Sequence, residues 1–357
     1  MKYWRGYLTA GILFACTWAL ESFAKAHIAL MDTIYPYITR MMQMFLADWS
    51  SGVDFCLWQV LLLVLAAAAI GTLALVVIFK WNPIQWFGWV CAVVAVVTFL
   101  NTGLFKLNMY AGSLAEDIRL EETDYTITEL EKAAAYYRDQ ANRISDLLQR
   151  DQNGEAILSD FDTLAERAPN GFEKLVYEES LAVFAGPMQP VKKLGWTKNY
   201  TKQGVTGVTV GLTGEAAVNP DVPSVLMPYA MCKEMAHRMS ILVPKDASFG
   251  AYMACMANPD PQFQYSGALM GYRYCLEALE ELNRDAAVRS GENANVRKDL
   301  DTCNGFLSKG EEGDADTCDL LTSWHIQEVV LPALVEEEDV FDPLDKSQVD
   351  LSDHPDA

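Results

Sequence analysis

The chain has 357 residues, of which 51% are apolar, and a formal net charge of −21 at pH 7. Such an acidic surface repels nucleic acid and anionic lipid headgroups, so neither is expected as a partner. The charge is unevenly spread. Residues 1–106 carry six lysines and arginines against four acidic residues, a balance of +2, which leaves −23 for the remainder. A nearly neutral, apolar front therefore precedes an acidic, soluble back.

Three apolar segments in the front predict membrane spans. Residues 55–79 and 86–105 are long enough to cross the ~30 Å hydrocarbon core of a bilayer, and a short connector makes them a helical hairpin. The first segment, at about 7–28, predicts either a span or a signal peptide, because Ala24-Lys25-Ala26 resembles a cleavage site. We favour an uncleaved span, since apolar sequence continues beyond that point. The lipid bilayer is thus an expected partner.

The positive charges of the front predict the orientation. Lys2, Arg5 and Lys80 belong on the cytoplasmic side, and Arg40 is the exception. This places the chain after Lys106 outside the cytoplasm, whichever interpretation of the first segment holds.

The outside part divides into three by composition. Residues 107–183 predict a helical scaffold, in which 126–151 has one apolar stripe and opens with a Thr-x-x-Glu capping box. Residues 184–335 predict a domain that mixes helices with strand. Residues 336–357 are acidic and interrupted by proline, and we expect them to be disordered.

The outside part has five cysteines, an odd number. Cys303 and Cys318 could form a disulfide if the compartment is oxidising. No C-x-x-C pair is present in the sequence, which excludes cysteine-based zinc ribbons.

The segment MCKEMAHRMSILVPKDASFGAYMAC, residues 231–255, is close to a zinc peptidase helix. In the H-E-x-x-H motif two histidines four residues apart share a helix face and bind zinc, and the glutamate is the general base. Here Lys233 occupies the first histidine position and is followed by Glu234 and His237. Alone, this pentapeptide carries little weight.

The surrounding motifs make it more specific. TGEAAVN (213–219), PYAMCKEMAHRMSI (228–241), DASFGAYMAC (246–255) and YSG (265–267) resemble bacterial membrane proteins of domain of unknown function 3810. The resemblance covers residues 1–280. It implies three N-terminal spans followed by a zincin-type domain, with two histidines and a glutamate as zinc ligands.

The departures from that pattern fall on the implied ligands. The three positions hold Lys233, His237 and Asp246, whereas Glu234, the implied general base, is unchanged. Lysine ligates zinc only as the neutral amine, and its reference pKa of about 10.4 makes that form costly near neutrality. We therefore expect no catalytic zinc and no other cofactor, with Glu234 vestigial. The Lys233 ammonium either replaces the metal electrostatically or turns to solvent. His325 could restore a ligand, although a distant histidine is an uncommon replacement.

A peptidase architecture without its metal still has a groove. In zincins an edge strand beside the metal helix binds an extended peptide by strand addition. VTGVTVGL (205–212) is the candidate strand, or alternatively plain sheet structure. The expected binding residues are Val208, Val210, Thr213, Gly214 and Glu215.

The sequence thus predicts an α+β fold, with N-terminal transmembrane helices followed by a zincin-like, mostly helical extracytoplasmic domain. The expected function is a pseudo-metallopeptidase of the bacterial cell membrane that binds a peptide or protein outside the cytoplasm. One alternative is an active zinc metallopeptidase with non-standard ligands. Another is an architectural protein that self-associates through 126–151.

Overall fold

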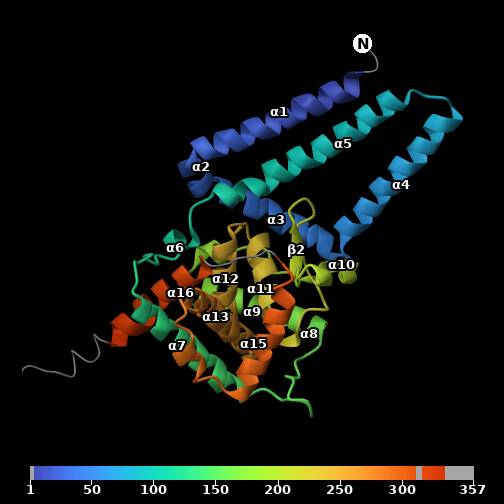
Figure 1. Cartoon of the computed structure of the whole chain (residues 1–357). Coiled ribbons are helices and arrows are strands. Elements are labelled where there is room, and N and C mark those ends of the chain that lie inside the picture. Colours follow the sequence, from blue (N-terminus) through green and yellow to red (C-terminus); the bar gives the residue numbers. More distant parts are fainter. Residues whose placement is uncertain (1–3, 311–315, 334–357) are drawn as a thin grey trace, which may run out of the picture.

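The computed structural model describes residues 4–310 and 316–333 of the chain. Long apolar helices extend from one side of a mostly helical domain (Figure 1). The mostly helical architecture agrees with the prediction from sequence. The predicted acidic tail, 336–357, lies outside the described residues.

The helices and strands follow one another with short connections. The α-helices are α1 (Arg5–Ala26), α2 (Ile28–Thr33), α3 (Tyr35–Ser51), α4 (Leu57–Ile78), α5 (Pro83–Leu104), α6 (Leu114–Asp117), α7 (Ile127–Ser145), α8 (Phe161–Arg167), α9 (Pro169–Tyr177), α10 (Thr197–Lys202), α11 (Met227–Arg238), α12 (Pro244–Ala257), α13 (Pro261–Glu281), α14 (Ala286–Arg289), α15 (Ala294–Leu307) and α16 (Thr317–His325). The strands are β1 (Lys192–Lys193), β2 (Gly207–Val210) and β3 (Glu215–Val218).

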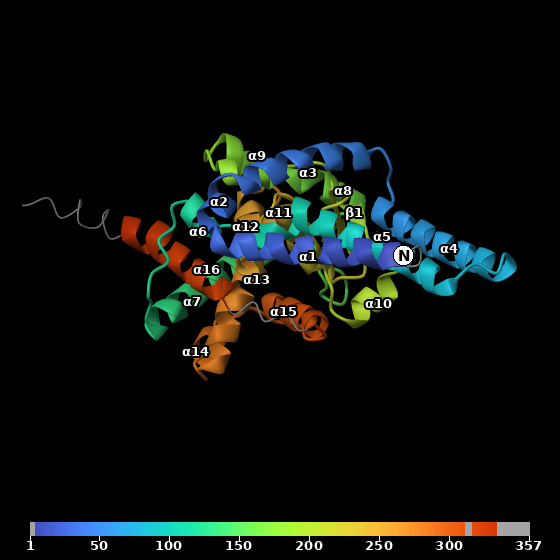
Figure 2. The same cartoon turned by 90° about the horizontal axis from the view of Figure 1, so that it is seen from above.

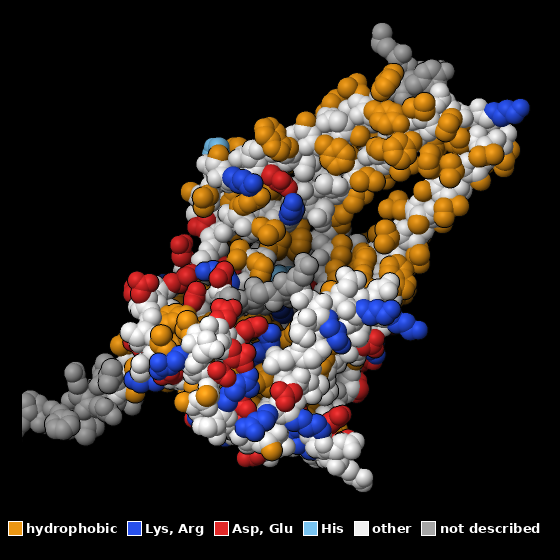
Figure 3. Space-filling view, viewed as in Figure 1, with side chains coloured by type: hydrophobic (Ala, Val, Ile, Leu, Met, Phe, Trp, Pro, Cys, Tyr) orange, Lys and Arg blue, Asp and Glu red, His pale blue; other side chains and the backbone are white. Residues whose placement is uncertain are grey.

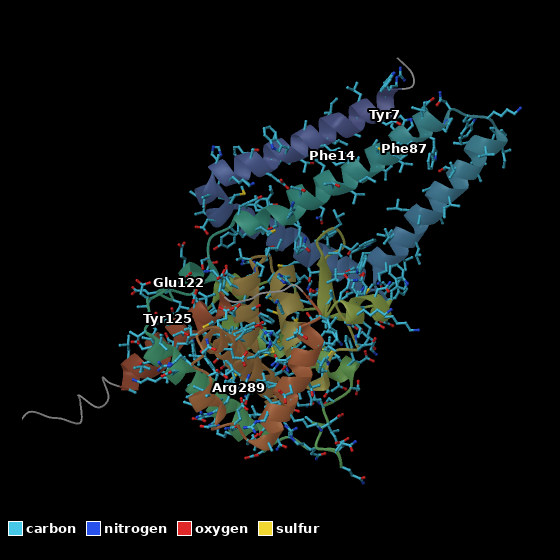
Figure 4. The ribbon with its side chains drawn as sticks, in the orientation of Figure 1. Tyr7, Phe14, Phe87, Glu122, Tyr125 and Arg289 are labelled. Atoms are coloured by element: carbon cyan, nitrogen blue, oxygen red, sulfur yellow. The ribbon has the colours of Figure 1, made fainter. Side chains whose placement is uncertain are left out.

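Helices α1, α4 and α5 are each long and apolar enough to cross a membrane, and they match the three predicted spans. Helix α1 packs along α5, where Gly6 meets Gly88 so closely that a Cβ at Gly6 would lie 2.4 Å from the Gly88 carbonyl carbon. Tyr7 and Phe87 continue this contact, with ring centroids 6.4 Å apart (Figure 4).

Apolar side chains cover these helices, whereas charged side chains are concentrated on the domain (Figure 3). The start of α1 and the α4–α5 connector lie at the ends of the helices that are distant from the domain (Figure 1). Lys80, in that connector, is therefore on the side opposite the domain, as the predicted orientation requires.

Helix α3 lies between the apolar helices and the domain (Figure 1), and Figure 2 shows it across the domain from above. It buries Thr39, Arg40 and Gln43 against the domain. Its opposite face exposes large apolar side chains, namely Tyr37, Ile38, Met41, Met44, Phe45 and Trp49. A helix with one polar face on protein and one exposed apolar face suits the boundary between lipid and water.

The core of the domain is built from α11, α12 and α13, which α7 and α16 cover. The capping box of α7 is present, with Thr126 and Glu129 bonded reciprocally. The helix ends at Ser145 instead of continuing to 151, because the chain turns directly after it, where Leu147 N donates to Ile144 O at 2.9 Å. Its apolar stripe packs against the core of the domain, chiefly against α13. Tyr137 of this stripe is fully buried, and its hydroxyl donates to Leu321 O.

The sheet has three short strands in the order β1-β3-β2, so β2 is an edge strand. It pairs antiparallel with β3, and Gly207 lies opposite Val218. Asn219 N donates to Thr206 O at 2.8 Å, which identifies 206 and 219 as a hydrogen-bonded pair. Because such pairs alternate along an antiparallel ladder, the backbone N–H and C=O of Gly207 and Thr209 point away from β3.

Candidate functional site

The motif residues lie on α11, which begins at Met227 with Pro228 in its first turn, where a proline is tolerated. Glu234 is buried and contacts the edge strand directly. The Thr209 hydroxyl donates to Glu234 Oε2 at 2.7 Å. A Cβ at Gly207 would lie 2.5 Å from Glu234 Cγ, so glycine is what allows β2 to approach the helix this closely. The predicted strand and the predicted general-base position are therefore adjacent.

Asp246 lies in the first turn of α12 and is 2% exposed. Its Oδ2 accepts a hydrogen bond from Leu114 N at 3.1 Å. Its Oδ1 is buried and has no hydrogen-bond partner among the described residues. Burial raises the pKa of Asp246 to about 6, although the Leu114 N–H and Lys245 act in the opposite direction. This carboxyl group faces a small cavity beside α3 that Arg40 also lines.

The three implied ligand positions lie on two helices, with Lys233 and His237 four residues apart on α11 and Asp246 in the first turn of α12. Lys233 lines one cavity and Asp246 lines another, and the two cavities share no residue. His237 lines neither of them, and its Nδ1 is 2.9 Å from Ile241 O. Within residues 4–310 and 316–333, no three His, Cys, Asp or Glu side chains form a group that could hold a metal ion.

His325, the possible replacement ligand, belongs to a different part of the domain. Its ring packs against Tyr136 at 5.0 Å between centroids and against Tyr137 at 6.4 Å. Burial lowers the pKa of His325, and nearby Lys132 adds to this effect. The environment is an aromatic cluster between α7 and α16, which is that of a core histidine.

The five expected binding residues divide into two groups. Val208 and Val210 lie on the edge strand, half-buried. Val208 packs with Trp58 and Leu194 on the face away from α11. Thr213, Gly214 and Glu215 instead lie where the sheet meets the membrane helices.

Glu215 is almost fully buried, with its carboxylate at the start of α4. It accepts hydrogen bonds from Leu57 N at 2.7 Å and Trp58 N at 2.9 Å. It also forms an ion pair with Lys192 at 2.8 Å. Anionic side chains stabilise helix N-termini, so Glu215 attaches a membrane helix to the sheet.

A cavity of about 450 Å³ lies at the beginning of β2 and was not predicted from sequence. Its walls come from the end of α10, from α11 and α13, and from the residues after α15. Three cations line it, Lys233, Arg273 and Lys309. Arg273 could have been suspected, because it is a lone cation within the otherwise apolar GALMGYRYCL.

The cysteines are free thiols in the structure, Cys303 and Cys318 included. The disulfide suggested by their spacing is thus absent between these two described residues. Cys318 lies against Cys275 and the Tyr125 hydroxyl, which is 3.7 Å from its sulfur.

Comparisons with characterised proteins and with solved structures give no match. A family model described as "Protein of unknown function (DUF3810)" matches residues 31–320. The match begins within α2 and includes α3, the sheet, α11, α12, α13 and the start of α16 up to Leu320. Since it covers most of the chain, the protein belongs to the DUF3810 family of proteins of unknown function.

Proposed function

We propose that this protein is a membrane-anchored peptide-binding module with a zincin-derived site that no longer hydrolyses peptides. The observation that supports this most strongly is the open edge of β2 beside the motif helix. Gly207 and Thr209 direct one N–H and one C=O each away from β3, and β3 is the only strand paired with β2 in the described part of the chain. An extended peptide satisfies these groups by adding a strand.

The contact between Thr209 and Glu234 supports a binding role over a catalytic one. A general base must reach the water that it activates. Glu234 Oε2 instead accepts the Thr209 hydroxyl, and Thr209 Oγ1 also lies 3.0 Å from the Glu234 carbonyl oxygen. The carboxylate thus takes part in holding the strand on the helix.

The membrane anchor follows from the three apolar helices and from α3. Arg40 donates from Nε to Met239 O at 3.2 Å, and Gln43 donates to Gly211 O at 2.9 Å. These bonds hold the domain against α3, whose apolar face is exposed for lipid. With Lys80 and the start of α1 on the cytoplasmic side, the domain is extracytoplasmic, and the proposed location is the bacterial cell membrane.

The test is whether the purified full chain in detergent binds peptides through their backbones. The ligand is a pool of random hexapeptides, compared with the same pool N-methylated at alternate residues. Strand addition requires peptide N–H groups, so methylation should reduce retention at least tenfold. Equal retention of the two pools would contradict strand addition.

The rival function is an active metallopeptidase with Glu234 as base. Metal content by mass spectrometry, for the natural chain and for a Lys233→His, Asp246→Glu double variant, addresses it. The proposal predicts less than roughly a tenth of a zinc ion per natural chain, because three protein ligands are the norm for catalytic zinc sites. Near one zinc per natural chain would instead favour the enzyme, and Glu234→Gln would then abolish hydrolysis.

A further inference from the structure

We propose that the cavity at the start of β2 binds the free carboxylate end of the peptide, so that the site selects C-terminal segments. This inference rests on the proposed function and specifies its ligand. It combines two independent features of the structure, the charge of the cavity and the direction of β2.

The cavity is cationic in a chain whose net charge is −21. Lys233 comes from α11, Arg273 from α13 and Lys309 from the residues that follow α15. None of the described residues lining the cavity is Asp or Glu. A partly enclosed group of cations in an otherwise acidic protein favours an anionic ligand, and carboxylate is the anion that every unmodified peptide carries at its end.

Arg273 is held in position before any ligand arrives. Its side chain is 12% exposed, and its Nε donates to Asn304 Oδ1 at 2.8 Å. Its guanidinium also lies 3.2 Å from the carboxylate of Glu277, one turn further along α13 and half-exposed. A planar guanidinium fixed in this way retains donors for a second carboxylate.

Two tyrosines of the cavity wall are also held by hydrogen bonds. The Tyr229 hydroxyl donates to Ser248 O at 2.9 Å and lies 3.1 Å from the Tyr274 hydroxyl. Both rings line the cavity together with the apolar side chains of Leu226, Met270 and Leu307. A volume of about 450 Å³ is within the range of small-ligand sites and accommodates a terminal residue with an apolar side chain.

The direction of β2 determines which end of a peptide reaches the cavity. Val205 and Thr206, immediately before the strand, line the cavity. A peptide antiparallel to β2 runs from Val210 towards Gly207, so its C-terminus arrives at the cations. A parallel peptide would bring its N-terminal ammonium there, and the three cations would repel it. Charge thus selects the antiparallel orientation.

The test compares two pools of random hexapeptides on the immobilised full chain in detergent, with retained peptides quantified by mass spectrometry. One pool has free C-terminal carboxylates and the other is C-terminally amidated. Removing a charge-assisted partner should reduce retention about tenfold or more. Free acetate and inorganic phosphate at equal ionic strength serve as competitors. If the cavity binds only small anions, acetate and phosphate will displace the retained peptides as effectively as an added free-carboxylate peptide does. That result would overturn the proposal.

Two variants locate the effect in the cavity. Lys309→Gln removes an exposed cation and should not disturb folding, whereas Arg273→Gln removes the fixed guanidinium. Each should reduce the preference for carboxylate over amide by roughly threefold or more, because each removes one cation that would contact the ligand carboxylate. Lys174→Gln, on α9, is the matched control because it removes an exposed lysine that does not line the cavity. It should leave the preference unchanged.

The outcomes separate this inference from the proposed function. Retention of both pools to the same extent would overturn carboxylate capture and leave strand addition intact. Retention of neither pool would overturn both. A carboxylate preference that persists in Lys309→Gln and Arg273→Gln would place recognition elsewhere and also overturn the assignment of this cavity.

Discussion

The two ends of strand β2 have different surroundings. At its end, the turn into β3 is enclosed by membrane-proximal elements: a Cβ at Gly211 would lie 2.2 Å from the Phe105 ring, and one at Gly214 would lie 2.5 Å from Ala47 N. At its start, Val205 and Thr206 border a cavity of about 450 Å³. The C-terminal end, at the turn into β3, leaves no room for a ligand and attaches the sheet to the membrane helices. The start of β2 has the space and charge that a ligand requires.

This contrast assigns structural roles to some residues and binding roles to others. At the enclosed end, substitutions should destabilise the protein. At the cavity end, they should change binding with little effect on stability. The predictions below follow this division, from the largest expected change in unfolding free energy to the smallest.

Glu215→Gln should have the largest effect. It removes the buried partner of Lys192 and weakens the attachment of α4, so the unfolding free energy should fall by about 3 kcal/mol or more. Chemical denaturation of the full chain in detergent measures this. Asp162→Asn, which breaks the exposed Lys193–Asp162 pair, is the control and should have little effect. If both substitutions lower the unfolding free energy equally, Glu215 does not hold α4 on the sheet as described.

Gly214→Ala should destabilise the protein by about 2 kcal/mol, because φ is +65° and the added Cβ would contact the backbone of α3. Gly305→Ala is the matched control, since a Cβ there meets nothing within 4 Å and alanine is the better helix former. The first should lower and the second should slightly raise the midpoint of denaturation. If Gly214→Ala leaves the midpoint of denaturation unchanged, α3 does not pack tightly against the turn.

Asp246→Asn should change how stability depends on pH. The folded pKa of Asp246, about 6, lies above its ordinary value of 3.8, so its contribution to stability is complete below pH 3.8 and is lost as pH rises through 6. At pH 8 the variant should be more stable than the natural chain by about 2 to 3 kcal/mol, and below pH 4 the two should agree. Denaturation curves at pH 4, 6 and 8 measure the difference. A constant difference across this range would contradict a buried, titrating carboxyl group.

Lys309→Gln should have the smallest effect, within about 0.5 kcal/mol, because the side chain is exposed at the cavity rim. The same denaturation experiment measures it. A loss of more than 1 kcal/mol (well above the ordinary surface range) would mean that the cavity end is also structural, and the contrast between the ends of β2 would disappear.

Local patterns predicted the elements whose signal lies in consecutive residues. The three predicted spans are present as apolar helices long enough to cross a membrane, and the Thr126–Glu129 capping box was confirmed. The strand at 205–212 was confirmed as the shorter Gly207–Val210. In each case the residues that specify the element are close together in the chain.

Features that depend on distant residues could not be predicted in this way. The role of α3 depends on its contacts with Met239 and Gly211, about 170 to 200 residues away. Glu215 was expected at a binding strand, but its partners, Leu57 and Trp58, belong to a membrane helix. The cavity joins side chains from four separate segments, and its charge becomes visible only when they are assembled.

The most direct test of the central claim is the fate of a bound peptide. The random hexapeptide pool is incubated with the full chain in detergent, with and without added Zn²⁺, and mass spectrometry measures both the retained peptides and any cleavage products. A binding module predicts retained, intact hexapeptides in both conditions. Shorter fragments that disappear in Glu234→Gln would contradict the account and identify the protein as a peptidase.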